Sequence, residues 1–379
     1  MEQKHQMCIF IGATGILPVT ILEASGRAMA ILLFLVTLLS AAMASAQIAG
    51  IETKLFDEPV KVQHGSSVLP LKSGAVLLFW FQGSAETGGD NEILCCRKTA
   101  GGWQAPWVVV HPQERPVNAI LRDAKVANTA TVQDEDGVVY LFYSAIPLYG
   151  GFANSRVDYK SSLDEGKTWS KPTRLDFSMG AMVRHKPLRV GDHEYLLPMY
   201  SELSLFTPGF KQYSYLWHLK LSGGRASKIR RIQIPGLDDI QPSLAFCGTG
   251  GRFICAYLRN QNGGLAYFSK LDWSTKEWSP IRLINVPNSD SPMDVVQLGD
   301  GRILMVYNNR ATRPRSPLSL SVSSDGENFT RLVDLETDPS SDYCYPSICE
   351  DAGKRIHISY TYHGRDAIKY VSFRELDLP

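Results

Sequence analysis

The sequence predicts an all-β fold, and more specifically a six-bladed β-propeller. After the first 46 residues, short apolar or alternating runs separated by Gly, Asn and Asp turns dominate, and helix-length periodic segments are nearly absent. Aromatic residues that close hairpins recur at intervals of fifty-odd to sixty-odd residues. Such intervals are typical of repeated four-stranded blades.

One repeat carries a specific turn motif. Residues 162–169 read S-x-D-x-G-x-T-W, the pattern of an Asp-box. We expect the Ser, Asp and Thr side chains to hydrogen-bond to the turn backbone, Gly166 to adopt a positive φ, and Trp169 to fill the base of the hairpin. This turn lies between the outer strands of propeller blades, so it indicates an architecture and carries no chemistry.

The other repeats match the Asp-box pattern less closely. Copies of the hairpin end at Trp103, Trp278 and Phe329. Each repeat also holds a turn followed by an apolar and aromatic run, which we expect to be the inner strand; these turns are Asp136-Gly137, Gly191-Asp192, Gly250-Gly251, Asp300-Gly301 and Ala352-Gly353. With an opening strand inside 68–81 they predict six blades across residues 50–379. Loops that enter and leave the inner strands are then expected to line an axial pocket.

Residues 1–46 are predicted to be an export leader. An apolar segment from 29 to 46 ends in Ala44-Ser45-Ala46, a small-x-small cleavage site before Gln47, and Arg27 supplies the positive flank. A membrane anchor is the alternative, although the apolar run is short for a full span. The sequence thus predicts one propeller domain over 47–379, secreted or periplasmic, with no stable membrane insertion once the leader is removed.

Charge and cysteine content narrow the possible partners. The formal net charge is +1, so the chain lacks the basic field that nucleic-acid binding requires. Of the seven cysteines all but Cys8 lie beyond the leader, and the sequence holds no C-x-x-C, no H-E-x-x-H and no paired Cys/His spacing. We therefore expect no metal, no cofactor and mostly buried, unpaired cysteines, with Cys344–Cys349 as the one suggested disulfide.

From residue 68 to residue 373 the chain resembles the bacterial sialidase-like propellers that carry BNR (Asp-box) repeats. Residues 184–187 and 195–198 resemble that family's K-x-K-P and L-L-x-P pair, and residues 239–243 contain its I-Q-P segment. Residues 287–294 resemble its P-N-x-x-S-x-x-D loop. Further matches follow in the family's order at 306–309, 316–318, 345–347 and 357–362. The resemblance implies the propeller fold and a glycan substrate.

The resemblance also implies catalytic roles. The anomeric carbon of a sialidase substrate bears a carboxylate that would repel a carboxylate nucleophile, so a tyrosine attacks, a glutamate takes its proton, and an acid protonates the leaving oxygen. By position in the family's pattern, Tyr345 would be the nucleophile and Glu202 the base. Asp294 would be the acid or an acceptor for a sugar hydroxyl. A packing tyrosine, a solvated loop carboxylate and a turn cap are the ordinary alternatives.

Arginines are the expected ligands of the substrate carboxylate, because a planar guanidinium matches it with two parallel hydrogen bonds. Arg184, Arg259 and Arg310 lie at strand ends of three different blades, and we expect them to converge on one carboxylate. Further hydrogen-bond donors are expected to line the same pocket: Lys186, Gln241 and Asn308.

The first blade departs from the family. Characterised sialidases open it with Arg-Ile-Pro, whose Arg belongs to the carboxylate clamp, but residues 64–70 contain no Arg, and the nearest carboxylates for the acid role are Glu86 and Asp90. Three functions stay open. The favoured one is an exo-α-sialidase-type glycosidase that removes a terminal acidic sugar. The others are a uronate polysaccharide lyase, in which arginines neutralise the uronate carboxylate and a tyrosine or a histidine such as His64 or His185 removes the ring proton, and a carbohydrate-binding propeller without catalysis.

Overall fold

The structure is a computed structural model that describes residues 7–10, 16–19, 48–60, 62–86, 88–112, 123–147, 151–203, 212–236, 238–248 and 250–379. The chain divides into two units, residues 1–46 and 47–379. In the first unit β1 (Met7–Phe10) pairs antiparallel with β2 (Ile16–Val19). The predicted apolar core and cleavage site at 29–46 lie outside the described residues, so export remains a prediction.

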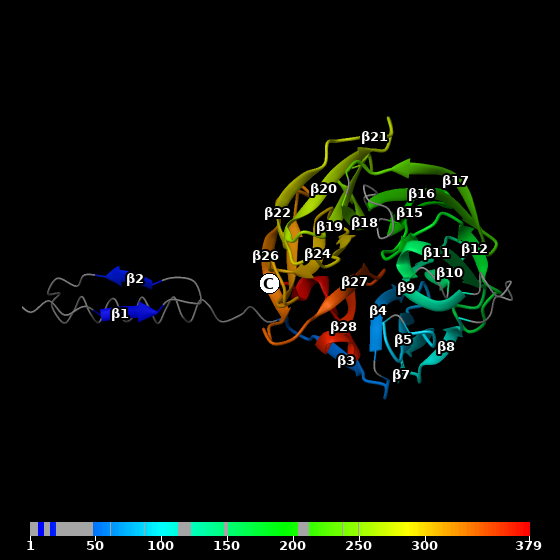
Figure 1. The fold of residues 1–379 in the computed structure, drawn as a ribbon, viewed down its shortest axis with the longest axis horizontal. Helices are drawn as coiled ribbons and strands as arrows, with labels where there is room; N and C mark the ends of the chain where they lie inside the picture. The colour runs from blue at the N-terminus through cyan, green and yellow to red at the C-terminus, as the bar shows by residue number, and fades with distance from the viewer. Residues whose placement is uncertain are drawn as a thin grey trace, which may run out of the picture. The chain divides into compact units, whose positions relative to one another are not determined.

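The second unit is a six-bladed propeller, which confirms the predicted fold (Figure 1). Blade 1 contains β4 (Val62–Pro70), β5 (Val76–Gly83), β6 (Glu92–Thr99), β7 (Gly102–Trp103) and β8 (Trp107–Val110). Blade 2 contains β9 (Asp123–Gln133), β10 (Val139–Pro147), β11 (Arg156–Ser162) and β12 (Thr173–Asp176). Blade 3 contains β13 (Ala181–Val183), β14 (Leu188–Gly191), β15 (Glu194–Ser201), β16 (Tyr213–Ser222) and β17 (Arg225–Gln233).

The second half of the ring repeats this arrangement. Blade 4 contains β18 (Asp239–Cys247), β19 (Phe253–Asn260), β20 (Gly264–Asp272), β21 (Glu277–Trp278) and β22 (Arg282–Asn288). Blade 5 contains β23 (Asp294–Gln297), β24 (Ile303–Asn308), β25 (Leu318–Ser323) and β26 (Thr330–Glu336). Blade 6 contains β27 (Cys344–Glu350), β28 (Arg355–Tyr362), β29 (Ala367–Arg374) and β3 (Glu52–Phe56). Short 3-10 turns lie at Gly151–Asn154, His363–Arg365 and Glu375–Asp377.

Ring closure depends on β3. This strand precedes blade 1 in the sequence, yet it pairs antiparallel with β29 of blade 6, from Ile368↔Phe56 to Ser372↔Glu52. The last blade is therefore completed by the N-terminal side of the propeller unit. Pairing both chain ends in one sheet removes the open edge that a linear array of blades would leave.

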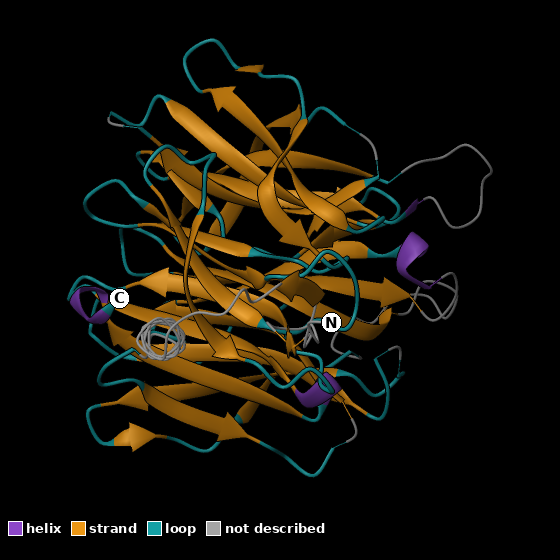
Figure 2. Ribbon diagram, turned by 90° about the vertical axis from the view of Figure 1, so that its left-hand side faces the viewer, coloured by secondary structure: helices purple, strands orange, loops and turns teal. Residues whose placement is uncertain are grey.

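The prediction for the inner strands was wrong. The runs that follow the five turns form the second strands β10, β15, β19, β24 and β28, and the strand before each turn lies innermost. The second strand is apolar because both of its faces are buried between blades. In β5, for example, Leu77 and Phe79 pack with blade 2, whereas Leu78 and Trp80 pack with blade 6. Figure 2 shows the strands of the blades with their connecting loops gathered at the two strand ends.

The Asp-box forms as predicted. The Gly166 N–H donates to Ser162 Oγ over 2.7 Å, the Thr168 N–H donates to Asp164 over 2.8 Å, and Trp169 Nε1 donates to the Gly166 carbonyl over 3.0 Å. Gly166 has φ +86°. The shortened copy in blade 5 repeats the scheme, because the Gly326 N–H donates to Ser323 Oγ over 2.9 Å.

Replacing the central aspartate tests the structural role of this turn. Asp164→Ala removes acceptors for the Thr168 N–H and hydroxyl, and we expect the free energy of unfolding to fall by about 1–2 kcal/mol. Urea denaturation measures this, with Leu163→Ala, at an exposed neighbouring position, as the control. Equal stabilities of the two variants would contradict the assignment.

The cysteine prediction needs a correction. A disulfide joins Cys247 in β18 to Cys255 in β19, with 6.0 Å between their Cα atoms. Cys344 and Cys349 are unpaired and buried, so the suggested bond between them was wrong. Strand β27 places those two residues five positions apart along one strand, whereas the β18–β19 hairpin brings Cys247 and Cys255 onto neighbouring strands.

Candidate active site

The candidate site lies where several inner strands contain β-bulges. The β-ladder slips at the start of four inner strands: β4, β9, β18 and β27. The residues at these bulges, Gly65, Asn128, Gln241 and Tyr345, all have φ between +42° and +65°. A bulge re-aims a side chain relative to the regular strand. Three polar side chains from three blades thereby meet at the end of the ring where the inner strands begin.

Tyr345 is the centre of this group. Its phenolic oxygen lies 3.3 Å from Gln241 Nε2 and 3.3 Å from Arg259 Nη1, both of which donate to it. The His64 ring lies 4.1 Å from the Tyr345 ring. Gln241 also donates to the Tyr200 hydroxyl over 3.2 Å. Two donors to its oxygen leave the Tyr345 hydroxyl proton free to pass to a base.

A small cavity of about 60 Å³ opens at this group. It is lined by Phe81, Glu86, Ala127, Asn128, Phe152, Met182, Tyr200, Glu202 and Tyr345. Its volume is room for about two water molecules, which the reacting end of a larger ligand would displace. Two carboxyl groups (Glu86 and Glu202) and two tyrosines (Tyr200 and Tyr345) therefore share one cavity, which is a suitable set for proton transfer and nucleophilic attack.

Glu202 directly follows β15, which is the second strand of blade 3 and not the inner strand that the sequence suggested. The pKa of Glu202 is raised to about 7, mainly by burial; Arg259 opposes the rise, and Asp290 adds to it. Its neighbour Gln212 donates a hydrogen bond to the carboxylate. A carboxyl group with a pKa near neutrality can both accept and release a proton at physiological pH.

Glu86 is a second carboxyl group in the cavity, and the sequence named it with Asp90 as one of the two nearest carboxylates for the acid role. It lies in the loop between β5 and β6, pairs with Arg365 over 2.9 Å, and lies 3.8 Å from His64 Nε2. Burial and the surrounding arginines lower the pKa of His64 well below its usual value. His64, which stands in the stretch where the family carries the Arg-Ile-Pro arginine, is therefore neutral.

An arginine cluster surrounds one carboxylate. Asp290 accepts hydrogen bonds from Arg259, at 2.8 and 2.6 Å, and from Arg313 at 3.0 Å. Arg315 donates to the Asp290 backbone carbonyl over 2.6 Å, and its guanidinium lies 5.8 Å from the centre of the Tyr345 ring. Sequence reasoning missed Asp290, Arg313 and Arg315; their place in the P-N-x-x-S-x-x-D loop and beside the matched residues 316–318 was the available signal.

Of the three predicted arginines, Arg184 and Arg259 lie beside Tyr345. Arg184 is buried 5.3 Å from the centre of the Tyr345 ring, where it donates to the carbonyls of Ser66, Tyr345 and Pro346. Arg310 is exposed at the end of β24, and no contact joins its side chain to the cluster among the described residues. Arg315 takes its place, because the loop after β24 folds back and the Arg315 N–H donates to Asp342.

The remaining predicted residues connect blades instead of lining the cavity; they are Asp294, Lys186 and Asn308. Asp294 is buried and accepts from Lys186 over 2.9 Å, from Ser243 over 2.6 Å and from the Ile348 N–H over 2.9 Å. Burial raises the pKa of Asp294, but Lys186, His185 and the Ser243 hydrogen bond together lower it below its usual value. Asp294 also does not line the cavity, so it is not placed to protonate a leaving group there. Asn308 donates to the carbonyls of Arg315 and Tyr343, which fixes the loop that carries Arg315.

One group of described side chains has the spacing of metal ligands. Ligand atoms of Asp134, Asp136 and His193 all lie within 4.8 Å of one another. They belong to the turns after β9 and β14, at the end of the strands opposite to Tyr345. The group therefore takes no part in the candidate site, and the sequence-based expectation of no metal and no cofactor stays a prediction.

A family model supplies the decisive comparison. The BNR repeat-like domain model matches residues 74–358, which is most of the chain. The protein belongs to the BNR repeat-like family. A comparison with curated proteins gives no match.

Solved structures share the fold of this BNR repeat-like protein. A Hadza microbial sialidase is 13% identical, with 84% of this chain and 66% of that chain covered and a TM-score of 0.69. The intramolecular trans-sialidase from Ruminococcus gnavus is 14% identical, with 89% and 99% covered and a TM-score of 0.64. An α-L-arabinofuranosidase from Fusarium graminearum is 12% identical, with 86% and 98% covered and a TM-score of 0.60. At these identities the likeness shows the fold, a sialidase-like propeller that also occurs in other glycosidases.

Within the described part of the chain, no helix has the length and apolar character needed to cross a bilayer.

Proposed function

We propose that this BNR repeat-like protein is an exo-glycosidase of the sialidase type that removes a terminal acidic sugar from a glycan. One observation carries the proposal: Tyr345, Glu202 and Glu86 line one cavity beside a cluster of arginines. The export leader that the sequence predicts at 1–46 extends the proposal to a secreted or periplasmic enzyme.

The geometry suggests a role for each group. Tyr345 attacks the anomeric carbon while Glu202 accepts the phenolic proton, and Glu86 protonates the leaving oxygen. The C–O bond to the leaving group breaks as the bond to Tyr345 forms. Water then attacks the glycosyl-tyrosine, with Glu86 accepting the water proton and Tyr345 recovering its own proton from Glu202. Two successive displacements retain the anomeric configuration.

Charge supports an acidic substrate. Arg184, Arg259 and Arg315 all contact Tyr345 or its ring, and Asp290 is the one carboxylate that binds the last two of these arginines among the described residues. Glu202 adds only a partial negative charge near neutral pH, because its pKa is about 7. Glu86, the other carboxyl group of the cavity, is paired with Arg365 over 2.9 Å. The cavity therefore has a surplus of positive charge, which favours an anionic sugar. Because Asp290 already occupies a place between arginines, the substrate carboxylate would bind beside it or replace it.

Two alternatives receive less support. A lyase with a histidine base is disfavoured, because burial lowers the pKa of His185 to about 3 and that of His64 well below its usual value, so that both rings are weak bases. A lyase with a tyrosine base is distinguished by its unsaturated product. A protein that only binds carbohydrate has no use for a buried glutamate with a pKa near 7 in a cavity with a tyrosine.

The direct test is release of free sialic acid from a mixed α2-3 and α2-6 sialoglycan by the purified protein. We expect release without an ultraviolet-absorbing product. An unsaturated, absorbing product from a uronate polysaccharide would identify a lyase instead. Release of a neutral sugar from an arabinofuranoside, with none from the sialoglycan, would contradict the acidic substrate and keep the glycosidase.

A further inference from the structure

Cations gather on the outermost strand of blade 3, although the formal net charge of the whole chain is only +1. Residues 203–237 contain no Asp or Glu and six cations, namely Lys211, Lys220, Arg225, Lys228, Arg230 and Arg231. The last four belong to β17, which lies at the outer edge of the ring (Figure 1). We call these four residues the basic strip. At about 3.3 Å per residue, the strip is about 20 Å long.

The cations of the basic strip have no acidic partner. Among the described residues, no ion pair or hydrogen bond joins any of the four side chains to a neighbour, and Arg230 Nε is buried without an acceptor. Lys228 and Arg231 lie instead over aromatic rings, 4.6 Å from the ring centre of Trp217 and 3.8 Å from that of Tyr215. A ring orients a cation but does not neutralise it. The strip therefore keeps its full positive charge.

Carboxylates that contact the same sheet are already occupied. Asp176 is 2% exposed and accepts from the Tyr215 hydroxyl over 2.9 Å and from Trp217 Nε1 over 2.6 Å. Glu194 lies 2.8 Å from His218 Nε2. Neither carboxylate makes an ion pair with the basic strip within the described part of the propeller. The outer edge of blade 3 is thus a local positive field on a nearly neutral protein, which attracts anions.

A pocket of about 500 Å³ opens at one end of the basic strip. We call it the strip pocket; it is lined by Tyr213, Arg231, Gln233, Ile234, Pro235 and Gly236. Gln233 Nε2 donates to the carbonyls of Ser214 and Ile234 over 2.8 and 3.2 Å, which orients the amide and leaves its oxygen as an acceptor. The strip pocket therefore offers a guanidinium to an acidic group, an amide oxygen to a hydroxyl group and apolar surface to a ring.

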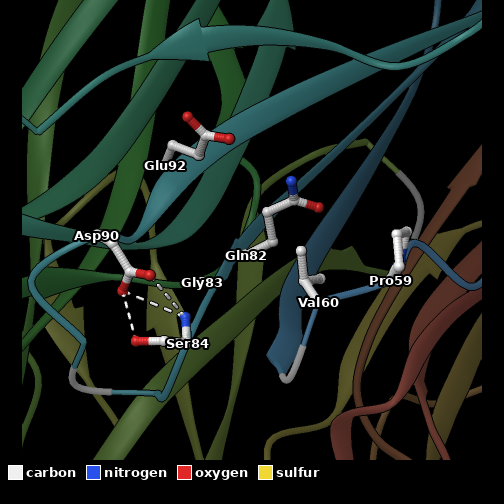
Figure 3. Close-up of a pocket in the computed structure, with 7 residues that line it drawn as sticks. All are labelled: Pro59, Val60, Gln82, Gly83, Ser84, Asp90 and Glu92. Carbon is white, nitrogen blue, oxygen red and sulfur yellow. Dashed lines mark hydrogen bonds between the residues drawn. The ribbon is translucent and has the colours of Figure 1, made fainter.

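A pocket beside blade 1 has the opposite character. Its volume is about 310 Å³, and its described lining contains Asp90 and Glu92 but no Lys or Arg. Figure 3 shows both carboxylates at this pocket, where Asp90 accepts from the Ser84 hydroxyl over 2.8 Å. An anionic ligand is repelled by such a lining and attracted to the basic strip.

We propose that the basic strip and the strip pocket bind an anionic polysaccharide, a polymer whose repeating unit carries a carboxylate or a sulfate. A row of unpaired cations matches a linear polyanion, and the free acceptor in the strip pocket matches a sugar hydroxyl. Nucleic acid fits less well, because Lys228 and Arg231 cover the aromatic rings on which bases would stack. No residue of β17 lines the axial cavity, so the inference does not depend on the proposed function.

The test measures binding of the full-length protein to heparin, which is sulfated, and to polygalacturonate, which is carboxylated, with dextran as the neutral polymer. We expect binding to an anionic polymer and none to dextran. The Kd should rise about tenfold or more between about 50 and about 500 mM NaCl, because salt screens exposed charges. In Arg225→Thr/Lys228→Thr/Arg231→Thr the Kd should rise about tenfold to a hundredfold, while threonine preserves the strand.

A matched variant removes the same charge elsewhere. Lys54→Thr/Arg331→Thr/Arg374→Thr replaces exposed cations of blades 5 and 6, and should change the Kd less than about threefold. Equal losses in the two triple variants, or no loss in the strip variant, would overturn the proposal. So would the absence of binding to both anionic polymers, or tighter binding to single-stranded oligo(dT) than to either. A preference for heparin or for polygalacturonate identifies the acidic group and supports the proposal.

A single substitution keeps the test decisive if the triple strip variant has a lowered thermal midpoint. Arg225 is exposed and makes no ion pair or hydrogen bond to a described residue, so Arg225→Thr should leave the thermal midpoint unchanged. Its Kd should rise about twofold to fivefold at low salt. An unchanged Kd in this variant would overturn the contribution of the strip.

Discussion

Tyr345→Phe should lower kcat for glycan cleavage by about a thousandfold or more, because it removes the oxygen that forms the glycosyl-enzyme bond. The change deletes one hydroxyl group and leaves the ring against His64 and Arg184. Gln241 keeps its second acceptor, Tyr200. The fold should therefore survive, and circular dichroism with a thermal melt checks this. The readout is a steady-state rate on the substrate that the wild-type protein cleaves.

Tyr343→Phe is the matched control for this variant. Tyr343 precedes β27, is buried, and packs its ring against Tyr362 and His363 instead of lining the cavity. Its activity should stay near that of the wild type. If Tyr345→Phe kept more than about a tenth of the wild-type kcat, the nucleophile would have to be another group, with Glu202 or Glu86 the first to examine.

Glu202→Gln should lower kcat/KM by about a hundredfold to ten-thousandfold, because the phenolic proton loses its acceptor. The wild-type pH profile supplies a second readout. A base must be ionised to work, and burial raises the pKa of Glu202 to about 7. Activity should therefore rise with pH through about 7, and this rising limb should be absent in Glu202→Gln.

Two further variants test whether Glu202 is the group whose ionisation causes the rise of activity with pH. Gln212→Met removes a hydrogen bond to the Glu202 carboxylate; since that bond favours the ionised form, the limb should move to higher pH. Asp239 is another described carboxyl group whose pKa is raised by burial to about 7, and it does not line the cavity. Asp239→Asn should leave the limb in place. A limb that persists in Glu202→Gln and vanishes in Asp239→Asn would refute the assignment of the base.

Local chemistry explains which features the sequence predicted well. The Asp-box depends on side chains within eight residues of one another, so its pattern is sufficient to predict its hydrogen bonds. The catalytic candidates could be predicted from the sequence for a related reason. Tyr345 and Gln241 each precede a proline at a strand bulge, and Glu202 follows a strand end, so short motifs mark all three positions.

Contacts between segments far apart in the chain explain why other predictions from the sequence were wrong. Inner and second strands are both apolar because each is buried between blades, so hydrophobicity alone assigned the wrong one to the axis. Arg310 and Arg315 are five residues apart, and only the return of their loop, fixed by Asn308 and Asp342, decides which reaches Tyr345. The Asp294–Lys186 pair joins side chains 108 residues apart and shows no local signal.

The sequence by itself determined the all-β architecture and the number of blades, because turn chemistry and strand patterns act over a few residues. The family resemblance suggested five residues that the structure brings together at the candidate site: Arg184, Glu202, Gln241, Arg259 and Tyr345. Tertiary structure decided the rest. It pairs β3 with the last blade, places Glu86 in the axial cavity beside Glu202, and gathers arginines around Asp290. These relations depend on closing a ring of six blades, and the distances they set arise only when segments far apart in the chain meet on one axis.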